Sequence, residues 1–299
     1  MYVVLGASGH SGHVVAKNLL ERGQKVRVVG RSADRLQSFA SQGAEVFVAD
    51  ASDAPALSKA LRGADAAYVL VPPNPTSHDY RAYQDRISDA IASAVQNSGI
   101  KRVVSLSSIG ADKPSGTGPV VGLYNLEQKL KQIEGANLLH LRAGYFMENT
   151  LPQVAVVRMM GSVAGPIRAD LKLAMIATRD IGAAAAEALL DGDFRGQQTK
   201  ELQGQRDLTY TEMAAIIGQA IGKPELGYVQ APDEQLRGAL VQMGMSANMA
   251  GLILEMAGAM NTGHMKALEP RSAENTTPTS FETFVEEEFA PAYREQMAA

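Results

Sequence analysis

The stretch Gly6-Ala7-Ser8-Gly9-His10-Ser11-Gly12 decides the fold of this chain. It follows the apolar run Tyr2-Val3-Val4-Leu5, which has the pattern of a short strand, and it opens a helix-like segment, residues 13–21. A strand, a glycine-rich turn and a helix, in this order, are the context that a dinucleotide-binding motif requires. The sequence therefore predicts a nucleotide site at its first turn.

The three glycines of this turn have separate expected roles. Gly6 permits the tight turn out of the strand, Gly9 lets the backbone approach a pyrophosphate, and Gly12 lets the helix pack close to the strand. The free N–H groups at the start of the helix would then face the phosphates, whose negative charge the helix dipole favours. We expect the other loop residues at the same ligand to be Ser8, His10 and Ser11.

The composition is that of an ordinary globular protein, since 45% of the 299 residues are hydrophobic and 20% are charged. This length allows one large domain or two coupled ones. A net charge of −4 argues against nucleic-acid partners and against attraction to anionic membranes. The absence of cysteine excludes disulfides, thiolate nucleophiles and zinc–sulfur sites.

Two further features of the sequence bear on its location. The apolar stretch from Ala247 to Met260 is too short to span a bilayer and contains Glu255. The first strand begins at the N-terminus, so we expect no cleavable signal. We therefore predict a cytoplasmic protein with no membrane partner.

The first half of the chain alternates strand-like and helix-like segments. After the first strand we expect strands at Lys25–Val29, Ala44–Ala49, Ala64–Val71, Lys101–Leu106 and Leu138–Arg142. The helical segments between them are Asp34–Gln42, Pro55–Leu61, Asp79–Asn97 and Val120–Ile133. This alternation predicts an α/β protein with a doubly wound parallel sheet, a Rossmann fold, whose ligands bind at the carboxyl ends of the strands.

We expect residues 1–150 to form the nucleotide-binding Rossmann domain. Residues 151–299 are expected to form a smaller α+β lobe on the substrate side, with parts that return to the Rossmann sheet. In this half, Asp180-Ile181-Gly182 predicts the cap of an Ala-rich helix, and Thr199–Leu202 has the pattern of a strand. Expected capping boxes, each before a helix, are Thr209-Tyr210-Thr211-Glu212 and Thr279-Ser280-Phe281-Glu282.

The helical region from Met243 to Met265 is rich in methionine. One interpretation is an ordinary core helix. The other is an adaptable lid or a dimer surface, because thioether side chains conform to varied partners.

The end of the second expected strand indicates which dinucleotide binds. Sheets that prefer NAD usually carry Asp or Glu there, bonded to the ribose 2′-hydroxyl, whereas this chain has Arg31 after Gly30. A guanidinium binds a 2′-phosphate through paired hydrogen bonds, and Ser32 and Arg35 lie close in sequence. We therefore expect NADP(H) rather than NAD(H). The competing interpretation is a solvated helix start.

Other positions near the expected site have two interpretations each. Asp50 ends the third strand and would either contact the adenine amine or cap the following helix. Val71 and Pro72 end the fourth strand, where the proline either stiffens a loop facing the cofactor or only stops the strand. His10 and His13 are three residues apart, but no third ligand is near and His10 lies in the expected phosphate loop, so we expect no metal site.

Several blocks resemble the NmrA-like branch of the atypical short-chain dehydrogenases/reductases. The most specific block is Leu141-Arg142-Ala143-Gly144-Tyr145-Phe146-Met147-Glu148-Asn149. Ser105-Leu106-Ser107-Ser108-Ile109-Gly110 resembles the family's fifth-strand end. The glycine turn, Gly30-Arg31 and residues 177–182, 209–224 and 277–293 are also similar, so the resemblance covers most of the chain.

The resemblance implies a Rossmann domain and a small C-terminal lobe with a cleft between them. Members of the family include NAD(P)H-dependent quinone reductases, reductases of plant phenylpropanoids, and regulators that bind the dinucleotide without known turnover. The resemblance also implies that Tyr145, Phe146 and Asn149 line the nicotinamide pocket. Taken without it, the two aromatic residues fit a core equally well.

The usual catalytic set of short-chain dehydrogenases is incomplete in this sequence. Such enzymes combine Ser with a Tyr-x-x-x-Lys pair, whose lysine lowers the pKa of the tyrosine. The matching segment starts at Tyr124, but Gln128 holds the lysine position and carries no charge. We predict Tyr124 as proton donor and Ser107, or its neighbour Ser108, as the hydrogen-bonding group for an acceptor oxygen. A packed helix tyrosine and a loop-capping serine are the competing interpretations.

Two functions fit these features. The first is an NADPH-dependent oxidoreductase that transfers hydride to a small electrophile such as a quinone or a conjugated carbonyl. The alternative is an NADP(H)-binding redox sensor without turnover, which the missing lysine favours. The expected partner is a small-molecule substrate, and a homodimer or a regulatory protein partner stays open.

Overall fold

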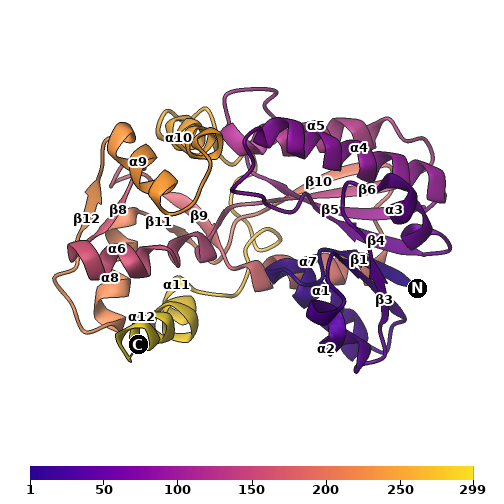
Figure 1. The fold of residues 1–299 in the computed structure, drawn as a ribbon, viewed down its shortest axis with the longest axis horizontal. Helices are drawn as coiled ribbons and strands as arrows, with labels where there is room; N and C mark the ends of the chain where they lie inside the picture. Colours follow the sequence, from indigo (N-terminus) through magenta and orange to yellow (C-terminus); the bar gives the residue numbers. More distant parts are fainter. Residues whose placement is uncertain (299) are drawn as a thin grey trace.

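A seven-stranded parallel sheet forms the larger part of the molecule (Figure 1). The computed structural model describes residues 1–298, and their side chains as far as residue 295. The strands follow the order β10-β6-β5-β4-β1-β2-β3, and every pair is parallel. Their bounds are β1 (Tyr2–Leu5), β2 (Val26–Gly30), β3 (Glu45–Val48), β4 (Ala66–Val69), β5 (Arg102–Ser108), β6 (Asn137–Ala143) and β10 (Gln197–Leu202). This order confirms the predicted doubly wound sheet.

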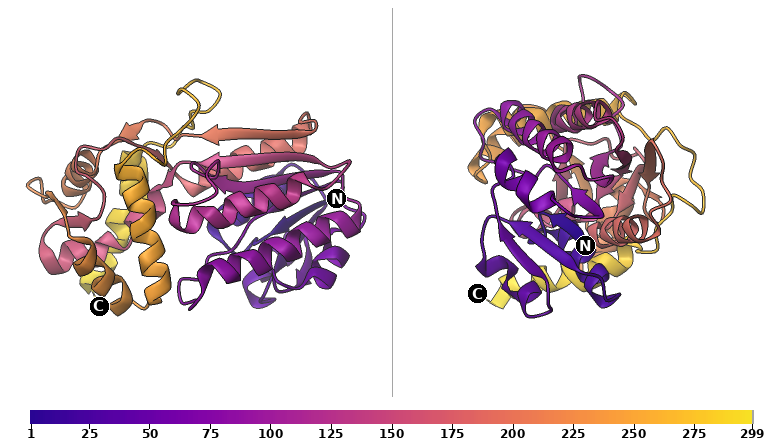
Figure 2. Two further views of the ribbon diagram at one scale, coloured as in Figure 1. Left: turned by 90° about the horizontal axis from the view of Figure 1, so that it is seen from above. Right: turned by 90° about the vertical axis from the view of Figure 1, so that its right-hand side faces the viewer.

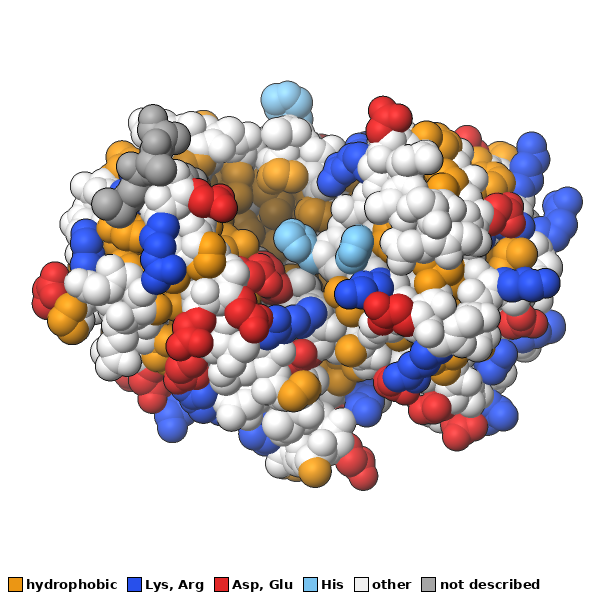
Figure 3. Space-filling model, turned by 90° about the horizontal axis from the view of Figure 1, so that it is seen from below, with side chains coloured by type: hydrophobic (Ala, Val, Ile, Leu, Met, Phe, Trp, Pro, Cys, Tyr) orange, Lys and Arg blue, Asp and Glu red, His pale blue; other side chains and the backbone are white. Residues whose placement is uncertain are grey.

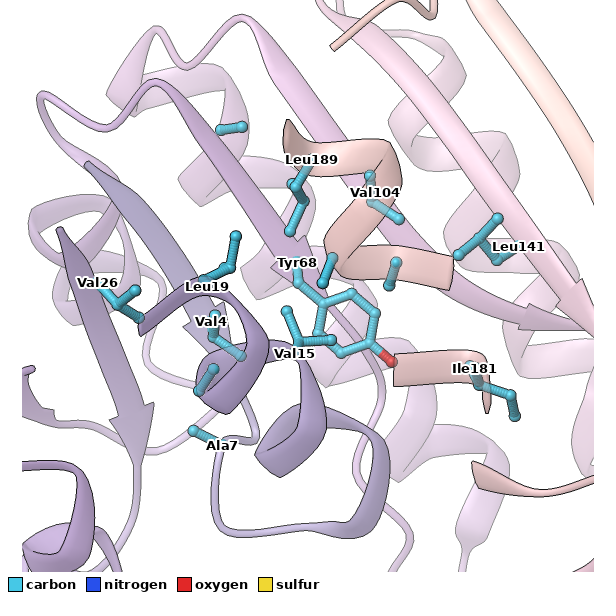
Figure 4. Close-up of a cluster of buried hydrophobic side chains, with 14 of the residues drawn as sticks. Val4, Ala7, Val15, Leu19, Val26, Tyr68, Val104, Leu141, Ile181 and Leu189 are labelled. Atoms are coloured by element: carbon cyan, nitrogen blue, oxygen red, sulfur yellow. The ribbon is translucent and has the colours of Figure 1, made fainter. Parts of the chain in front are cut away.

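Helices cover both faces of this sheet, which explains why its central strands β1, β2 and β4 are almost continuously apolar. One face carries α1 (His10–Glu21), α2 (Gln37–Ala40) and α7 (Thr178–Asp191). The other carries α3 (Ala54–Leu61), α4 (Tyr80–Ser98) and α5 (Val121–Lys131). Figure 4 shows the first core, where the fully buried ring of Tyr68 from β4 lies among Val4, Val15 and Leu189.

The smaller part lies beside the carboxyl ends of the main sheet (Figures 1 and 2). It has two short sheets, β11-β9-β7 and β12-β8, around their own apolar core. Their bounds are β7 (Tyr145–Phe146), β8 (Val163–Gly165), β9 (Leu173–Ile176), β11 (Asp207–Leu208) and β12 (Tyr228–Gln230). The helices are α6 (Gln153–Met160), α8 (Tyr210–Ala220), α9 (Asp233–Gln242), α10 (Ala247–Asn261), α11 (Phe281–Phe284) and α12 (Ala290–Ala298).

Two elements of the second half belong to the main sheet. Strand β10 pairs with β6 at the edge, and helix α7 packs against α1. The chain therefore passes between the two parts more than once. The boundary that we place between residues 150 and 151 stays a prediction.

The capping box at Thr209 is confirmed. The Thr209 hydroxyl accepts from the Glu212 N–H at 3.1 Å, and the Glu212 carboxylate accepts from the Thr209 N–H at 2.7 Å. This reciprocal pair satisfies two N–H groups that have no partner within helix α8.

The other two predicted caps are wrong. Helix α7 begins at Thr178, so Asp180 lies inside its first turn, and helix α11 is capped by Ser280 rather than by Thr279. The physical reason is that the two residues bind each other. The Asp180 carboxylate accepts from the Thr279 N–H at 2.9 Å and from its hydroxyl at 2.7 Å. A contact between distant segments has replaced two local ones.

The methionine-rich region forms α10 and the segments on either side of it. Met249 and Met260 are buried, whereas Met243 is 55% exposed. The segment is thus partly core and partly surface. Within residues 1–298, no helix combines the length and the hydropathy needed to cross a membrane.

Candidate functional site

A cavity of about 1060 Å³ follows the carboxyl ends of the parallel strands. Its lining includes the residues at the ends of β1 to β6, and its opposite wall comes from β9 and α10 in the smaller part. Figure 3 shows a hollow between the two parts, with hydrophobic side chains on its floor and histidines at its edge. Doubly wound sheets bind their ligands at this edge, where the strand order reverses.

The glycine-rich turn borders this cavity as predicted. Gly6 has a φ of +67°, which permits the sharp turn after β1. A Cβ at Gly12 would overlap the carbonyl oxygen of Gly6, so only glycine allows α1 to lie this close to the turn. Because α1 begins at His10, its N-terminus lies at the cavity and favours a phosphate there.

The hydroxyl group of Ser11 is free to donate a hydrogen bond, because its own oxygen accepts one from Tyr68. The Tyr68 hydroxyl donates to the Ser11 hydroxyl at 2.9 Å, and both groups are buried. Burial raises the pKa of Tyr68 well above its ordinary value, so the tyrosine keeps its proton. The proton of Ser11 is then available to a ligand in the cavity.

Two arginines border the cavity near the ends of β1 and β2. Arg31 and Arg35 are exposed and line it, and the Arg35 guanidinium lies 3.5 Å from the carbonyl oxygen of Ser8. A cationic pair beside the phosphate-binding turn suits a ligand with an additional phosphate. Ser32 is not among the residues that line the cavity.

Asp50 also lines the cavity, but it does not cap α3. Its carboxylate accepts from the Ser52 hydroxyl at 2.6 Å and from the Ser52 N–H at 2.8 Å, which holds the pKa of Asp50 below its ordinary value. The cap is Asp53, which accepts from the Ala56 N–H at 2.9 Å. The capping interpretation of Asp50 is therefore wrong, and its contact with adenine stays a prediction.

Most of the predicted site residues come together at this cavity. Those that line it are Gly6, Ser8, Gly9, His10, Ser11, Arg31, Arg35, Asp50, Val71, Pro72, Ser107, Tyr145, Phe146 and Asn149. Those that do not are Gly12, Ser32 and Tyr124. Tyr124 is half-buried on α5, and its neighbour Leu123 takes its place in the lining.

A buried charged network lies directly behind Ser107, and the sequence did not indicate it. The Glu127 carboxylate accepts from Arg142 Nε at 2.9 Å, from Arg142 Nη2 at 2.7 Å and from the Ser107 hydroxyl at 2.6 Å. Burial opposes the charge, yet the hydrogen bonds from Arg142 and Ser107 hold the pKa of Glu127 below its ordinary value. The one sequence feature that could have pointed to this network is that Arg142 belongs to the block most specific to the family resemblance.

The wall opposite the main sheet is apolar and aromatic. Met256, Met260 and Met265 line it together with residues of β9. The Tyr145 hydroxyl lies 3.0 Å from the Tyr210 hydroxyl, and burial raises the pKa of Tyr145. Such a wall suits a largely apolar ligand, because methionine side chains adapt to varied shapes.

The donor set fits a dinucleotide with an additional phosphate. It combines a helix N-terminus, a glycine turn without side chains, a free serine proton and two arginines along one cavity. Within the part of the chain that the structure describes, no group of three or more His, Cys, Asp or Glu side chains is arranged to hold a metal ion.

Known proteins resemble this chain over most of its length. It is 28% identical over 276 residues to a (4-alkanoyl-5-oxo-2,5-dihydrofuran-3-yl)methyl phosphate reductase of Streptomyces griseus, covering 92% of this chain and 93% of the relative. It is 27% identical over 260 residues to quinone oxidoreductase 2 of Escherichia coli, covering 85% of this chain and 86% of the relative.

A solved structure shares the fold. The NADPH-dependent quinone oxidoreductase of Escherichia coli, in complex with NADPH, superimposes with a TM-score of 0.81 at 24% identity, covering 95% of this chain and 98% of the other. The family model described as the NmrA-like family matches residues 2–289. The chain therefore belongs to the NmrA-like family, as the blocks around Arg142 and the glycine turn predicted.

Proposed function

We propose that this protein is an NADP(H)-dependent reductase of a small electrophile, either a quinone or a conjugated carbonyl. The observation that carries the proposal is the continuity of the cavity, which joins the phosphate-binding turn to the methionine-lined wall. A dinucleotide at the turn and an apolar acceptor at the wall would share one continuous space. The two curated relatives, a reductase and a quinone oxidoreductase, support this class of reaction.

The roles of the residues follow from their places around the cavity. The N-terminus of α1 and the Ser11 proton hold the diphosphate, and Arg31 and Arg35 hold the 2′-phosphate. The bound cofactor supplies the hydride. The apolar wall around Met260 excludes water and orients the acceptor.

The proton donor that we predict is Tyr124, which does not line the cavity, although its neighbour Leu123 does. A quinone does not depend strictly on such a donor, because solvent can protonate the product. We therefore expect Tyr124→Phe to slow the reduction of conjugated carbonyls more than the reduction of quinones, measured as kcat/KM for each.

The test of the function is the oxidation of NADPH by purified protein with a panel of benzoquinones, naphthoquinones and conjugated ketones. We expect turnover with at least one class, and a large loss of it in the Arg31→Asp variant when NADPH is the donor. Nucleotide binding without turnover across the whole panel would contradict the proposal.

A second function is favoured by one observation. Gln128 stands where a catalytic lysine is expected, so Tyr124 has no charge at this position to activate it. A redox sensor would bind NADP(H) without turnover and would retain a partner protein in one redox state only. Pull-downs with the oxidised and the reduced nucleotide separate this function from the first.

A further inference from the structure

Ser107 lies where the cavity meets the buried network of Glu127 and Arg142. It belongs to β5, lines the cavity, and is only 2% exposed. Its hydroxyl oxygen lies 2.6 Å from Oε1 of Glu127, which is 1% exposed. The direction of this hydrogen bond decides what Ser107 can offer to a ligand.

Glu127 is ionised in this setting. Arg142 donates to both of its carboxylate oxygens, at 2.9 Å and 2.7 Å, and Lys131 Nζ lies 3.7 Å from Oε2. The nearby His140 ring is buried and adds no proton to the network at neutral pH. A carboxylate held by two cations is an acceptor only, so the hydrogen bond must run from Ser107 to Glu127.

The consequence is that Ser107 presents only lone pairs to the cavity. A serine has a single hydroxyl proton, and Glu127 takes it. A carbonyl oxygen of a substrate placed against Ser107 would meet another acceptor. A group that carries N–H would be bound.

We propose that Glu127 is a positioning residue that makes Ser107 the hydrogen-bond acceptor for the carboxamide N–H of the nicotinamide. This inference rests on the proposed cofactor. With the diphosphate at Gly9 and the adenosine near Arg31, the other half of the dinucleotide extends over the ends of β4 and β5, where Ser107 lies. In this proposal Ser107 accepts a hydrogen bond from the cofactor and does not donate one to the substrate oxygen. This role differs from the one predicted from the sequence.

The test compares two ligands by titration calorimetry: NADP+ and its 3-acetylpyridine analogue, in which a methyl ketone replaces the carboxamide and carries no N–H. We expect the wild-type protein to bind NADP+ about five-fold more tightly, the usual effect of one neutral hydrogen bond. Ser107→Ala should bind both ligands equally, with the whole loss falling on NADP+.

The matched control is Ser105→Ala. Ser105 lies on the same strand and is 1% exposed, but its hydroxyl bonds to His140 Nδ1 at 2.7 Å, and it does not line the cavity. This variant should keep the wild-type preference for NADP+. Equal losses for both ligands in Ser107→Ala, or an unchanged preference, would overturn the proposal.

A second variant tests the role of Glu127. In Glu127→Met the side chain offers Ser107 no acceptor oxygen, so the Ser107 proton is free to turn toward the cavity. We expect this variant to bind the acetyl analogue at least as well as NADP+, and an unchanged preference for NADP+ would contradict the positioning role. If this variant does not fold, as thermal unfolding will show, the Ser107→Ala titration still decides the proposal.

The titration does not depend on turnover. A protein that binds both ligands but reduces nothing would contradict the proposed reductase and leave the result for Ser107 readable. A protein that binds neither ligand would overturn both proposals.

Discussion

We propose that the choice of nucleotide depends on Arg31. It is an exposed cation at the edge of the cavity, and its charge acts on the nearby Asp50. We expect Arg31→Asp to weaken NADP+ binding by about 2–4 kcal/mol, because a charge-assisted contact is lost and a repulsion is added. NAD+ binding should change much less, as titration calorimetry can measure. Arg62→Asp, an exposed change outside the cavity, is the control, and equal losses for both nucleotides would exclude Arg31 as the discriminating group.

His140 predicts how stability depends on pH. Its ring is fully buried, and burial lowers the pKa of His140 from 6.5 to about 4. As the pH falls below 6.5 the unfolded chain takes up a proton that the folded protein refuses, so the folded state loses stability. We expect a loss of about 2 kcal/mol between pH 7 and pH 5.

Urea unfolding at the two pH values measures this loss, and the His140→Asn variant should nearly abolish it. Glu127 affects the stability of the protein in a different pH range. Its folded pKa lies below its ordinary value of 4.5, so its contribution is lost only below that pH. Equal stability of the wild-type protein at pH 7 and pH 5 would contradict this prediction, because it would mean that His140 takes up its proton in the folded protein as well.

Residues that act through local geometry were predictable, and residues that act through distant partners were not. The glycine turn and Arg31 follow from their positions after a strand, which the sequence displays directly. Glu127 gives no such signal, because its partners Ser107 and Arg142 come from two other elements. Asp50 was a plausible cap from its place after a strand, but its carboxylate binds Ser52, and Asp53, which was not predicted as a cap, caps α3.

At the scale of elements, α7 packs against α1 directly behind the glycine-rich turn. A Cβ at Gly182 of α7 would lie 2.6 Å from Val14 Cβ and 2.7 Å from the Ser11 carbonyl oxygen. We expect Gly182→Ala to push the helices apart, to cost about 1–3 kcal/mol of stability, and to weaken nucleotide binding as well. Thermal unfolding and titration measure the two effects.

Gly258→Ala is the matched control for this prediction. Gly258 also lies within a helix, α10, but a Cβ there would meet nothing within 4 Å. That substitution should raise stability by up to about 1 kcal/mol, since alanine favours the helix more than glycine does. A neutral Gly182→Ala would show that α7 can move away from α1 without effect on the site.

The central strands of the main sheet could be placed from the sequence because a strand buried on both faces is a short apolar run, and here such runs alternate with helical segments. The caps of α7 and α11 could not, because Asp180 and Thr279 are nearly a hundred residues apart and satisfy each other. A local pattern cannot reveal that a better partner lies elsewhere in the fold.

At the scale of the whole molecule, the cavity is walled by both parts, so a ligand should couple them. We expect NADP+ at one hundred times its dissociation constant to raise the free energy of unfolding by about 2.7 kcal/mol. The chain has no tryptophan whose fluorescence could report unfolding, so circular dichroism is used to follow the transition. Hydrogen exchange should slow in α10 as well as in residues 6–12, and slowing confined to the turn would contradict the coupling.

The cleft itself was expected from the family resemblance, but the sequence left open whether the methionine-rich region is a core helix, a lid or a dimer surface. The face of α10 that meets the cavity carries Met256 and Met260, and α10 is apolar on several sides, with buried residues such as Leu252 and Ala257. Periodicity alone does not say which side of such a helix meets the ligand.

Strand β10 has a consequence for how the polypeptide is made. It completes the main sheet beside β6, yet it is synthesised only after β7, α6, β8 and β9 of the smaller part. Until β10 emerges from the ribosome, β6 is the edge strand of the nascent sheet, and one row of its backbone N–H and C=O groups is unpaired. These groups can pair with a strand of another chain, although the residues of β6 are almost all buried in the finished protein. In a protein truncated near residue 150 the edge of β6 would stay unpaired, because β10 is missing. Such an N-terminal fragment should therefore aggregate where the intact chain does not.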